Sequence, residues 1–334
     1  MGHPNHSSWD TWLSFLFELL DFSDKVAPSA SEIGISWGQA TAPATKLMNR
    51  RDFIVRTACG VGMAMASRSS FALDITPAAT SRFSATDTVE IGKTGIKTSR
   101  LAMGTGTFGF GGRSNQTSLG SKELVNLLLN GYDSGLRMFD TADAYGSHPH
   151  VAGALKHVPR DKVTVLTKTD SRGAQGVRAD LDRYRRELGT DYIDIVLLHC
   201  LTEGDWTERY KGAMDVLSEA RQKGIIRAHG CSCHTLEALG AAARSPWVDV
   251  DLVRINPIGS HMDAGSSAVT GVLREMQTAG KGIVGMKILA QGDMRSRPDD
   301  ALRYALSLNL LDAFTIGAEN KGEQNDLIRR IAAA

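Results

Sequence analysis

Residues 163–199 read VTVLTKTDSRGAQGVRADLDRYRRELGTDYIDIVLLH. An apolar run typical of a strand begins at Val163, and a second begins 29 residues later at Tyr192. A strand, its crossover helix and the next parallel strand together need about 30 residues. This stretch therefore predicts one β-α-β unit.

The same period continues in both directions along the chain. Eight strand-like runs begin at residues 101, 138, 163, 192, 225, 252, 282 and 313, at spacings of 37, 25, 29, 33, 27, 30 and 31 residues. Amphipathic helix-like segments separate them, for example at residues 122–130 and 212–223. Eight alternating units in about 250 residues predict an α/β fold, a single closed (β/α)8 TIM barrel over residues 87–334.

An open doubly wound sheet is the main competing fold. Gly104, Gly106 and Gly109 match its G-x-G-x-x-G dinucleotide-binding fingerprint in letters. No acidic residue follows a second strand at the expected ribose-binding position, so the barrel is favoured. Ahead of the first strand, residues 89–98 resemble a short N-terminal β-hairpin that turns at residues 92–95 and would close the lower end of the barrel.

Composition excludes several classes of protein. The 334 residues are 42% hydrophobic and 22% charged, with 38 Lys and Arg against 37 Asp and Glu, which is typical of a globular protein and not of a disordered or disulfide-dense chain. This balance gives no electrostatic footprint for a nucleic-acid partner. The longest weakly polar run, residues 57–67, is shorter than the roughly 18 residues of a membrane span, so we expect no stable membrane insertion of the mature protein.

Residues 48–72, MNRRDFIVRTACGVGMAMASRSSFA, have the layout of an export signal. A cationic start precedes a weakly apolar stretch and a small-x-small ending, and Arg50-Arg51 followed by Asp-Phe-Ile resembles the twin-arginine signal. We therefore expect a signal peptide, the twin-arginine export machinery as a partner, and a periplasmic or secreted protein. An amphipathic helix with exposed arginines, in a cytoplasmic protein, is the alternative.

The segments on either side of this signal differ from it in composition. Residues 1–47 contain two lysines, no arginine and five acidic residues, which is unlike the start of an export signal. We predict that translation begins at Met48 and that residues 1–47 are an over-extended start or a disordered segment; a short amphipathic helix at residues 9–22 is the alternative. Residues 73–86 are rich in Ser, Thr and Ala, which predicts an unstructured linker.

Four ionisable residues end three neighbouring predicted strands. Asp140 and Tyr145 follow the second strand, Lys168 ends the third and His199 ends the fourth. Active sites of such barrels lie at these strand ends, so the joint placement favours an acid–base site over an interior ion pair, a surface Tyr and a core His. A buried ammonium beside a Tyr favours the phenolate, which predicts a pKa below the usual value of about 10.

The runs MFDTADAYG at 138, VTVLTKT at 163 and LGTDYIDIVLLH at 188 resemble the aldo-keto reductase family over residues 87–330. This resemblance implies a barrel that binds NAD(P)H without a Gly-rich loop and reduces an aldehyde or ketone to an alcohol, or the reverse. It also implies that Tyr145 is the general acid, that Lys168 and Asp140 tune its pKa, and that His199 orients the substrate carbonyl.

The same resemblance places Ser232, Cys233, Met286 and Lys287 around the nicotinamide. Cys233 replaces the usual Asn, Leu252 replaces a Gln that contacts the carboxamide, and Met286 replaces a stacking aromatic residue. The Met-Lys pair resembles a subgroup that often carries a C-terminal iron–sulfur extension, and we expect no such extension here. These departures support an alternative function, a non-catalytic dinucleotide- or partner-binding barrel exported to the periplasm.

After the eighth strand, residues 315–325 resemble the dinucleotide-phosphate turn of the family. The turn includes Gly317, Lys321, Gln324 and Asn325, and N–H groups at a helix start suit a pyrophosphate. Lys321 either meets a 2′-phosphate or is an exposed loop lysine. NADP is the expected cofactor, with NAD as the alternative. Trp206 either lines the pocket for a small carbonyl or alcohol substrate or packs its loop onto the barrel.

Cysteines and histidines give no familiar metal motif. Cys200, Cys231, Cys233 and His234 end neighbouring strands, so a disulfide or a metal site there is conceivable. The Cys-x-Cys-His spacing matches no common zinc pattern, so we expect buried thiols and no metal site. The His-Pro-His run at residues 148–150 is interpreted as an exposed loop.

Overall fold

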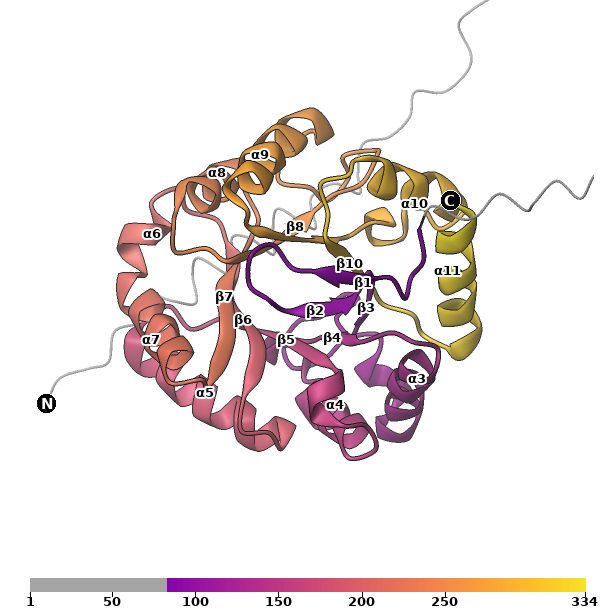
Figure 1. Ribbon diagram of the computed structural model, residues 1–334, viewed down its shortest axis with the longest axis horizontal. Helices are drawn as coiled ribbons and strands as arrows, with labels where there is room; N and C mark the ends of the chain where they lie inside the picture. The colour runs from indigo at the N-terminus through magenta and orange to yellow at the C-terminus, as the bar shows by residue number, and fades with distance from the viewer. Residues whose placement is uncertain (1–82) are drawn as a thin grey trace, which may run out of the picture. The chain divides into compact units, whose positions relative to one another are not determined.

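The computed structural model describes residues 83–334, which form a closed barrel of eight parallel strands surrounded by helices (Figure 1). The predicted segments at residues 1–47 and 48–72, and residues 73–82 of the linker, lie outside the described residues. The strands are β3 (Leu101–Gly104), β4 (Met138–Asp140), β5 (Thr164–Thr169), β6 (Ile193–Leu201), β7 (Ile226–Cys233), β8 (Val250–Arg254), β9 (Gly282–Met286) and β10 (Ala313–Ile316). All eight predicted strands are therefore confirmed.

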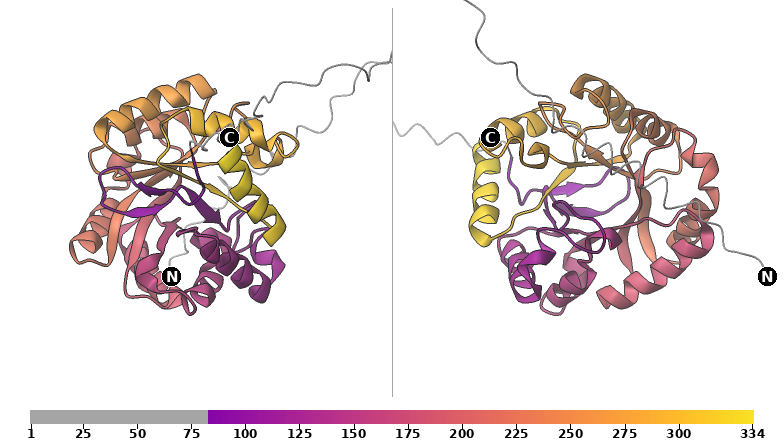
Figure 2. Two further views of the ribbon diagram at one scale, coloured as in Figure 1. Left: turned by 45° about the vertical axis from the view of Figure 1, so that its right-hand side comes forward. Right: turned by 180° about the vertical axis from the view of Figure 1, so that it is seen from behind.

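Helices follow the strands in chain order and cover the outside of the barrel, as both views of Figure 2 show. They are α3 (Ser121–Asp133), α4 (His148–Leu155), α5 (Ala174–Leu188), α6 (Trp206–Arg209), α7 (Lys211–Gln222), α8 (Leu236–Arg244), α9 (Ser266–Ala279), α10 (Pro298–Ser307) and α11 (Lys321–Ala333). Each strand pairs with the next, and β10 pairs with β3, which closes the barrel. No helix within residues 83–334 is long and apolar enough to cross a membrane.

Two apolar clusters form the core. The inner cluster fills the barrel with side chains from all eight strands, among them Ala102, Met138, Leu166, Ile195 and Leu252. The outer cluster lies between the strands and the helices. Successive residues of a strand point to opposite faces, so this arrangement decides which strand residues face the barrel interior and which face the helices.

The predicted N-terminal hairpin is confirmed and closes one end of the barrel. Its strands are β1 (Thr88–Glu90) and β2 (Lys97–Ser99), which are antiparallel. Ile91 and Ile96 in its turn are fully buried in the inner cluster. Gly92 N donates to Asp312 Oδ2 at 2.9 Å, and Asp312 precedes β10, so the hairpin covers the N-terminal ends of the strands (Figure 1).

The last four residues of the predicted linker belong to the barrel. Ala85 is fully buried and its carbonyl accepts from Leu101 N at 2.9 Å, while the guanidinium of Arg100 lies 4.9 Å from the centre of the Phe83 ring. The linker prediction is therefore wrong for residues 83–86. Composition alone suggested a spacer, but backbone bonding to the first barrel strand orders this segment.

Candidate active site

The four residues predicted at the strand ends lie together at the C-terminal rim of the barrel. Asp140 ends β4, Lys168 lies in β5, His199 lies in β6, and Tyr145 ends the short 3-10 helix η2 (Asp143–Tyr145). Their exposed fractions are 5%, 0%, 7% and 9% in that order. The structure therefore assembles one buried cluster from three consecutive strands, as the sequence predicts.

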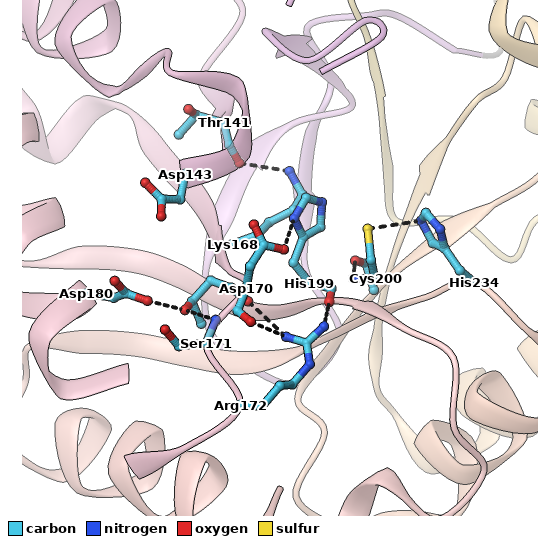
Figure 3. A network of polar contacts seen from close by, with 12 residues as sticks. Thr141, Asp143, Lys168, Asp170, Ser171, Arg172, Asp180, His199, Cys200 and His234 are labelled. Atoms are coloured by element: carbon cyan, nitrogen blue, oxygen red, sulfur yellow. Dashed lines mark hydrogen bonds and ion pairs between the residues drawn. The ribbon is translucent and has the colours of Figure 1, made fainter. Parts of the chain in front are cut away.

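The Lys168 ammonium is fixed by two acceptors. Lys168 Nζ donates to Asp140 Oδ1 at 2.5 Å. It also donates to the Thr141 carbonyl at 2.8 Å (Figure 3). It also lies 4.8 Å from the centre of the Tyr145 ring. Burial of a charge requires such pairing, so Asp140 and Thr141 hold the ammonium beside the phenol.

Tyr145 differs from the sequence prediction in its protonation. Burial raises the pKa of Tyr145 well above its usual value, and the neighbouring Asp140, Cys200 and Asp170 raise it further. The predicted lowering by Lys168 is therefore wrong in this structure, because removal from water outweighs the attraction of an ammonium already paired with a carboxylate. Tyr145 is a neutral phenol at ordinary pH, able to donate its proton.

His199 lies beside Tyr145 and is oriented by an acid that sequence reasoning missed. The two ring centres are 5.7 Å apart in an edge-to-face arrangement, and His199 Nδ1 is 3.0 Å from Asp170 Oδ1. Burial lowers the pKa of His199, but hydrogen bonds with Asp170 and Cys200 outweigh it, so the pKa lies above its usual value. Asp170 directly follows the end of β5, two residues after Lys168. Its position at a strand end is the signal by which the sequence could have identified it.

Two glycines of the G-x-G-x-x-G run make room for the Tyr145 ring. A Cβ atom on Gly106 would lie 2.2 Å from Tyr145 Cε2, and one on Gly109 would lie 2.3 Å from Cδ1. At Gly104 a Cβ atom would lie 2.8 Å from Thr315 Oγ1. These glycines therefore serve close packing between the β3 loop, the phenol and β10, a role that the letters alone did not reveal.

An ion-pair network anchors η2, which carries Tyr145. Arg183 on α5 binds both carboxylate oxygens of Asp143 at 2.7 Å and also Glu187 at 3.1 Å. Glu187 Oε2 is 2.8 Å from His148 Nδ1, and His148 Nε2 is 2.7 Å from Thr167 Oγ1. His148 is 2% exposed and begins α4, so the exposed loop predicted here is wrong. Its imidazole joins α4, α5 and β5, a tertiary role with no local sequence signal.

The residues predicted around the nicotinamide face in different directions. Ser232 is fully buried, and its Oγ accepts from Cys200 N at 3.0 Å. Leu252 lies in the inner cluster and Met286 packs against it. Cys233, the next residue after Ser232, belongs to the outer cluster, so the structure does not bring its side chain to the face that Ser232 occupies.

Lys287 follows β9 and turns back on its own loop. Its φ is 55°, and its Nζ donates to Gln291 Oε1 at 2.9 Å. Burial lowers the pKa of Lys287, and the nearby Arg254 lowers it further. The ammonium is therefore partnered within the chain.

The start of α11 is partly occupied by its own side chains. Asn320 Oδ1 accepts from Glu323 N at 2.9 Å, and Glu323 Oε2 accepts from Glu319 N at 2.9 Å. This is a capping-box arrangement that satisfies two of the donors a phosphate would use. Gly317 lies just before it, where a Cβ atom would be 2.4 Å from Thr107 Oγ1.

Among the other three residues of the predicted phosphate turn, Gln324 and Asn325 are bonded to another helix, whereas Lys321 is exposed. Lys321 is exposed at the first position of α11. Gln324 is buried, and its Oε1 accepts from Asn130 Nδ2 at 2.8 Å, while Asn325 Oδ1 accepts from the same group at 3.1 Å. Both side chains therefore join α11 to α3.

Trp206 lies in the helical layer. It is fully buried, its indole N–H donates to the Ala238 carbonyl at 3.1 Å, and its ring meets Trp247 edge to face at 6.1 Å. Of the two sequence interpretations, the structure favours packing of the loop onto the barrel.

A thiol that the sequence did not assign to the site lies beside His199. Cys200 adopts a φ of 53°, and its Sγ is 3.4 Å from His234 Nε2 (Figure 3). Burial and the nearby Arg254 and Lys287 lower the pKa of His234 to about 3, so its imidazole is neutral at ordinary pH. Cys200, Cys231 and Cys233 are free thiols.

Comparison with known proteins identifies the class. The model of the Aldo/keto reductase family matches residues 101–327, so the chain belongs to that family. Similar solved structures reach TM-scores of 0.56 to 0.64 at 16 to 24% identity, which shows the shared fold. One is a Bombyx mori aldo-keto reductase in complex with NADP, with a TM-score of 0.56 and 18% identity over 74% of this chain and 91% of that chain.

Two curated relatives carry more specific names. D-threo-aldose 1-dehydrogenase from a Pseudomonas species is 27% identical over 56% of this chain and 66% of its own length. The NADH-specific methylglyoxal reductase of Escherichia coli K12 is 28% identical over 43% of this chain and 51% of its own length. The matches thus span about half to two thirds of these relatives.

Proposed function

We propose that the protein is an NAD(P)H-dependent oxidoreductase that reduces an aldehyde or ketone to an alcohol, or catalyses the reverse reaction. The observation that carries this proposal is the buried Tyr145 phenol, which lies close to both the paired Lys168 ammonium and the His199 ring. Tyr145 donates its proton to the carbonyl oxygen as negative charge develops there. The function then follows from this one rim cluster.

The other three residues position and stabilise that proton transfer. His199 orients the carbonyl oxygen, and Asp170 holds the imidazole by accepting from its Nδ1–H. Lys168 stabilises the phenolate that remains after the proton leaves, and Asp140 keeps the ammonium in place. In the reverse direction the Tyr145 phenolate, stabilised by Lys168, would accept the proton of the alcohol.

The residues at the β7–β10 rim fit a nicotinamide dinucleotide. Asn256 Oδ1 and Thr315 Oγ1 are buried at the ends of β8 and β10 and have no hydrogen-bond partner within residues 83–334, which suits a polar ligand. Ser232 and Met286 would hold the nicotinamide end, and Gly317 the phosphate end. The cofactor supplies the hydride when bound.

NADP is the favoured cofactor and NAD the alternative. Lys321 is exposed at the α11 start, where it suits a 2′-phosphate, and the Bombyx mori neighbour binds NADP. The relative from Escherichia coli is named NADH-specific, and Glu319 and Glu323 beside Lys321 disfavour extra negative charge. A small polar carbonyl compound or a sugar is the expected substrate, by analogy with the names of both relatives.

Location is a separate proposal that rests on the sequence. The twin-arginine pattern at residues 48–72 supports export to the periplasm. That route carries folded proteins, so the barrel would load its cofactor before export. Cell fractionation of the native host checks this, since a protein confined to the cytoplasm contradicts export.

A second candidate function is a binding barrel without turnover. The capping box at the start of α11 and Leu252 in the inner cluster favour it, because both remove polar partners for a dinucleotide. Fluorescence titration of the full chain with NADPH and NADH, followed by a screen of small aldehydes, separates the two functions. Binding with turnover supports the reductase; binding without turnover on any carbonyl compound supports the second candidate.

A further inference from the structure

Three potential metal ligands meet on the outer face of β7 and β8, away from the barrel interior. Cys231 Sγ lies 3.9 Å from Cys233 Sγ and 3.4 Å from Asp251 Oδ1, and Cys233 Sγ lies 3.9 Å from the same oxygen. All three residues are fully buried, and their donor atoms lie within 4.8 Å of one another. We call Cys231, Cys233 and Asp251 the β7–β8 cluster.

Strand register explains why these residues meet. Residues two apart on a strand share a face, so both thiols point outward from β7. Cys231 is the direct neighbour of Asp251 in the parallel register. Gly230 permits a close approach of the two strands, because a Cβ atom there would lie 1.8 Å from the Val250 carbonyl oxygen. The cluster is thus built by the sheet itself.

The carboxylate in this cluster has an unpartnered oxygen. Asp251 Oδ2 is buried and has no hydrogen-bond partner within the described part of the chain. Oδ2 of Asp263, in the loop after β8, is likewise buried and unpartnered, while its Oδ1 accepts from Arg254 Nε at 2.7 Å. Buried polar atoms without partners are uncommon, and an ion is one of the usual reasons for them.

We propose that the β7–β8 cluster binds a thiophilic divalent cation, Zn²⁺ in the first place, through Cys231 Sγ, Cys233 Sγ and the Asp251 carboxylate. Thiolate sulfur and carboxylate oxygen are both common zinc ligands. Binding displaces the two thiol protons and any carboxyl proton to solvent, and it requires no oxidant or reductant. The site is separate from the Tyr145 cluster and does not depend on the proposed reductase activity.

Charge balance supports a divalent ion. Two thiolates and one carboxylate carry three negative charges, and the Lys281 ammonium, which acts electrostatically on Cys231 and Asp251, supplies one positive charge. A divalent cation makes the total zero in a site from which water is excluded. Without a cation, burial raises the pKa of Cys231 to about 11, so this thiol keeps its proton at ordinary pH.

Two other polar clusters suit a cation less well. Asp143, His148 and Glu187 have metal-ligand spacing, but Arg183 already forms ion pairs with both carboxylates. Cys200 and His234 form a pair at the rim, and within residues 83–334 no third His, Cys, Asp or Glu side chain lies close enough to complete a metal site with them. That pair nevertheless supplies a control, because it is the other place where a thiol-seeking ion would bind.

The bound ion would link β7 to β8 directly below the rim. Ser232 lies between the two cysteines in sequence and faces the opposite side of the sheet. Fixing Cys231 and Cys233 therefore also fixes the Ser232 backbone. The expected role is structural, and its direct readouts are metal content and thermal stability, both independent of turnover.

The test begins with the full chain expressed with added zinc and purified in a non-chelating reductant. Elemental analysis should find about one zinc ion per chain, and Co²⁺ added to metal-free protein should produce a thiolate-to-cobalt charge-transfer band. Cys231→Ser and Cys233→Ser should each lose both signals. Cys200→Ser, the matched control, should keep both and should keep the rise in Tm that zinc gives the unsubstituted protein.

Three results overturn the proposal. The first is reduced, folded protein that holds no zinc and gives no cobalt–thiolate band. The second is metal that remains in Cys231→Ser and Cys233→Ser but is lost in Cys200→Ser, which would assign it to the rim pair. The third is a Cys231–Cys233 disulfide found by mass spectrometry together with no metal uptake after reduction. The first and third results are measured on the unsubstituted protein, so they remain valid if a variant fails to fold.

Discussion

The rim formed by β4–β6 and the rim formed by β7–β10 differ in how their polar groups are partnered. On the first rim, Lys168 is bonded to Asp140 and His199 to Asp170. On the second rim, Asn256 Oδ1 and Thr315 Oγ1 have no partner within residues 83–334. The comparison indicates that the chain itself supplies partners for the ionisable groups of the first rim, whereas the second rim has two polar atoms without a partner, where we propose that a ligand binds.

Of the effects predicted for the two rims, the largest is the loss of turnover when the Tyr145 hydroxyl is removed. Tyr145→Phe should reduce carbonyl turnover by about 100- to 10,000-fold, because a general acid typically contributes that much. Affinity for NADPH should stay the same, since the phenol lies on the β4–β6 rim. Tyr304→Phe, which removes a phenol from α10, is the control, and normal turnover in Tyr145→Phe would exclude the assigned role.

A methyl group at Gly106 tests whether the glycine run serves Tyr145. Gly106→Ala should displace the ring and lower turnover, with a loss of about 1–3 kcal/mol in the free energy of unfolding from overpacking. Urea unfolding and steady-state assays measure both effects. Gly271→Ala in α9, where a Cβ atom meets nothing within 4 Å, is the matched control and should be neutral or stabilising. Equal behaviour of the two variants would contradict the packing role.

The pair of His199 and Asp170 gives a dependence on pH. The folded-state pKa of His199 is raised, so its contribution is complete below the unfolded value of about 6.5 and is lost as pH rises through the folded value. The pKa of Asp170 is lowered despite burial, by its bond to His199, so its contribution is lost as pH falls through the folded value. Their common window lies near pH 5 to 6.

Asp170→Asn should therefore destabilise the fold most in that window, and the difference from the unsubstituted protein should shrink towards pH 8. Thermal unfolding across pH 4.5–8.5 measures it. Asp293→Asn removes an acid from an exposed contact with His261 and should show a much smaller difference. A deficit that grows with rising pH would have the opposite sign and would refute the pairing.

The smallest expected effect concerns the β7–β10 rim. Lys321→Ala should weaken NADPH binding by about two- to fivefold and leave NADH binding unchanged, because an exposed charge near a helix start contributes little. Fluorescence titration at low and high salt measures it. Lys122→Ala at the start of α3 serves as the control. An equal loss for both dinucleotides would remove Lys321 from the 2′-phosphate site.

The 30-residue period was sufficient to predict all eight barrel strands, because each apolar run is buried on both faces in a parallel sheet. Strand ends likewise predicted Tyr145 and its three neighbours, since parallel strands bring their carboxyl ends to one rim. Both predictions use only the positions of residues along the chain. Position suffices in these cases because the order of the parallel strands decides which residues lie together.

Other features depend on tertiary partners and were missed for that reason. His148 is buried through Glu187, 39 residues away in sequence, and no local pattern indicates that pairing. The raised pKa of Tyr145 results from burial, which the neighbouring Lys168 does not reveal. Cys233 is different, because strand alternation already implies that it faces away from Ser232.

Deuterium transfer tests the central claim most directly. The full chain is incubated with NADPH that carries deuterium at nicotinamide C4 and with methylglyoxal, the carbonyl compound that the name of one relative mentions. The proposed function predicts deuterium on the new carbinol carbon, detected by mass spectrometry and lost in Tyr145→Phe. Saturable NADPH binding without label transfer to methylglyoxal or to other small carbonyl compounds would contradict it.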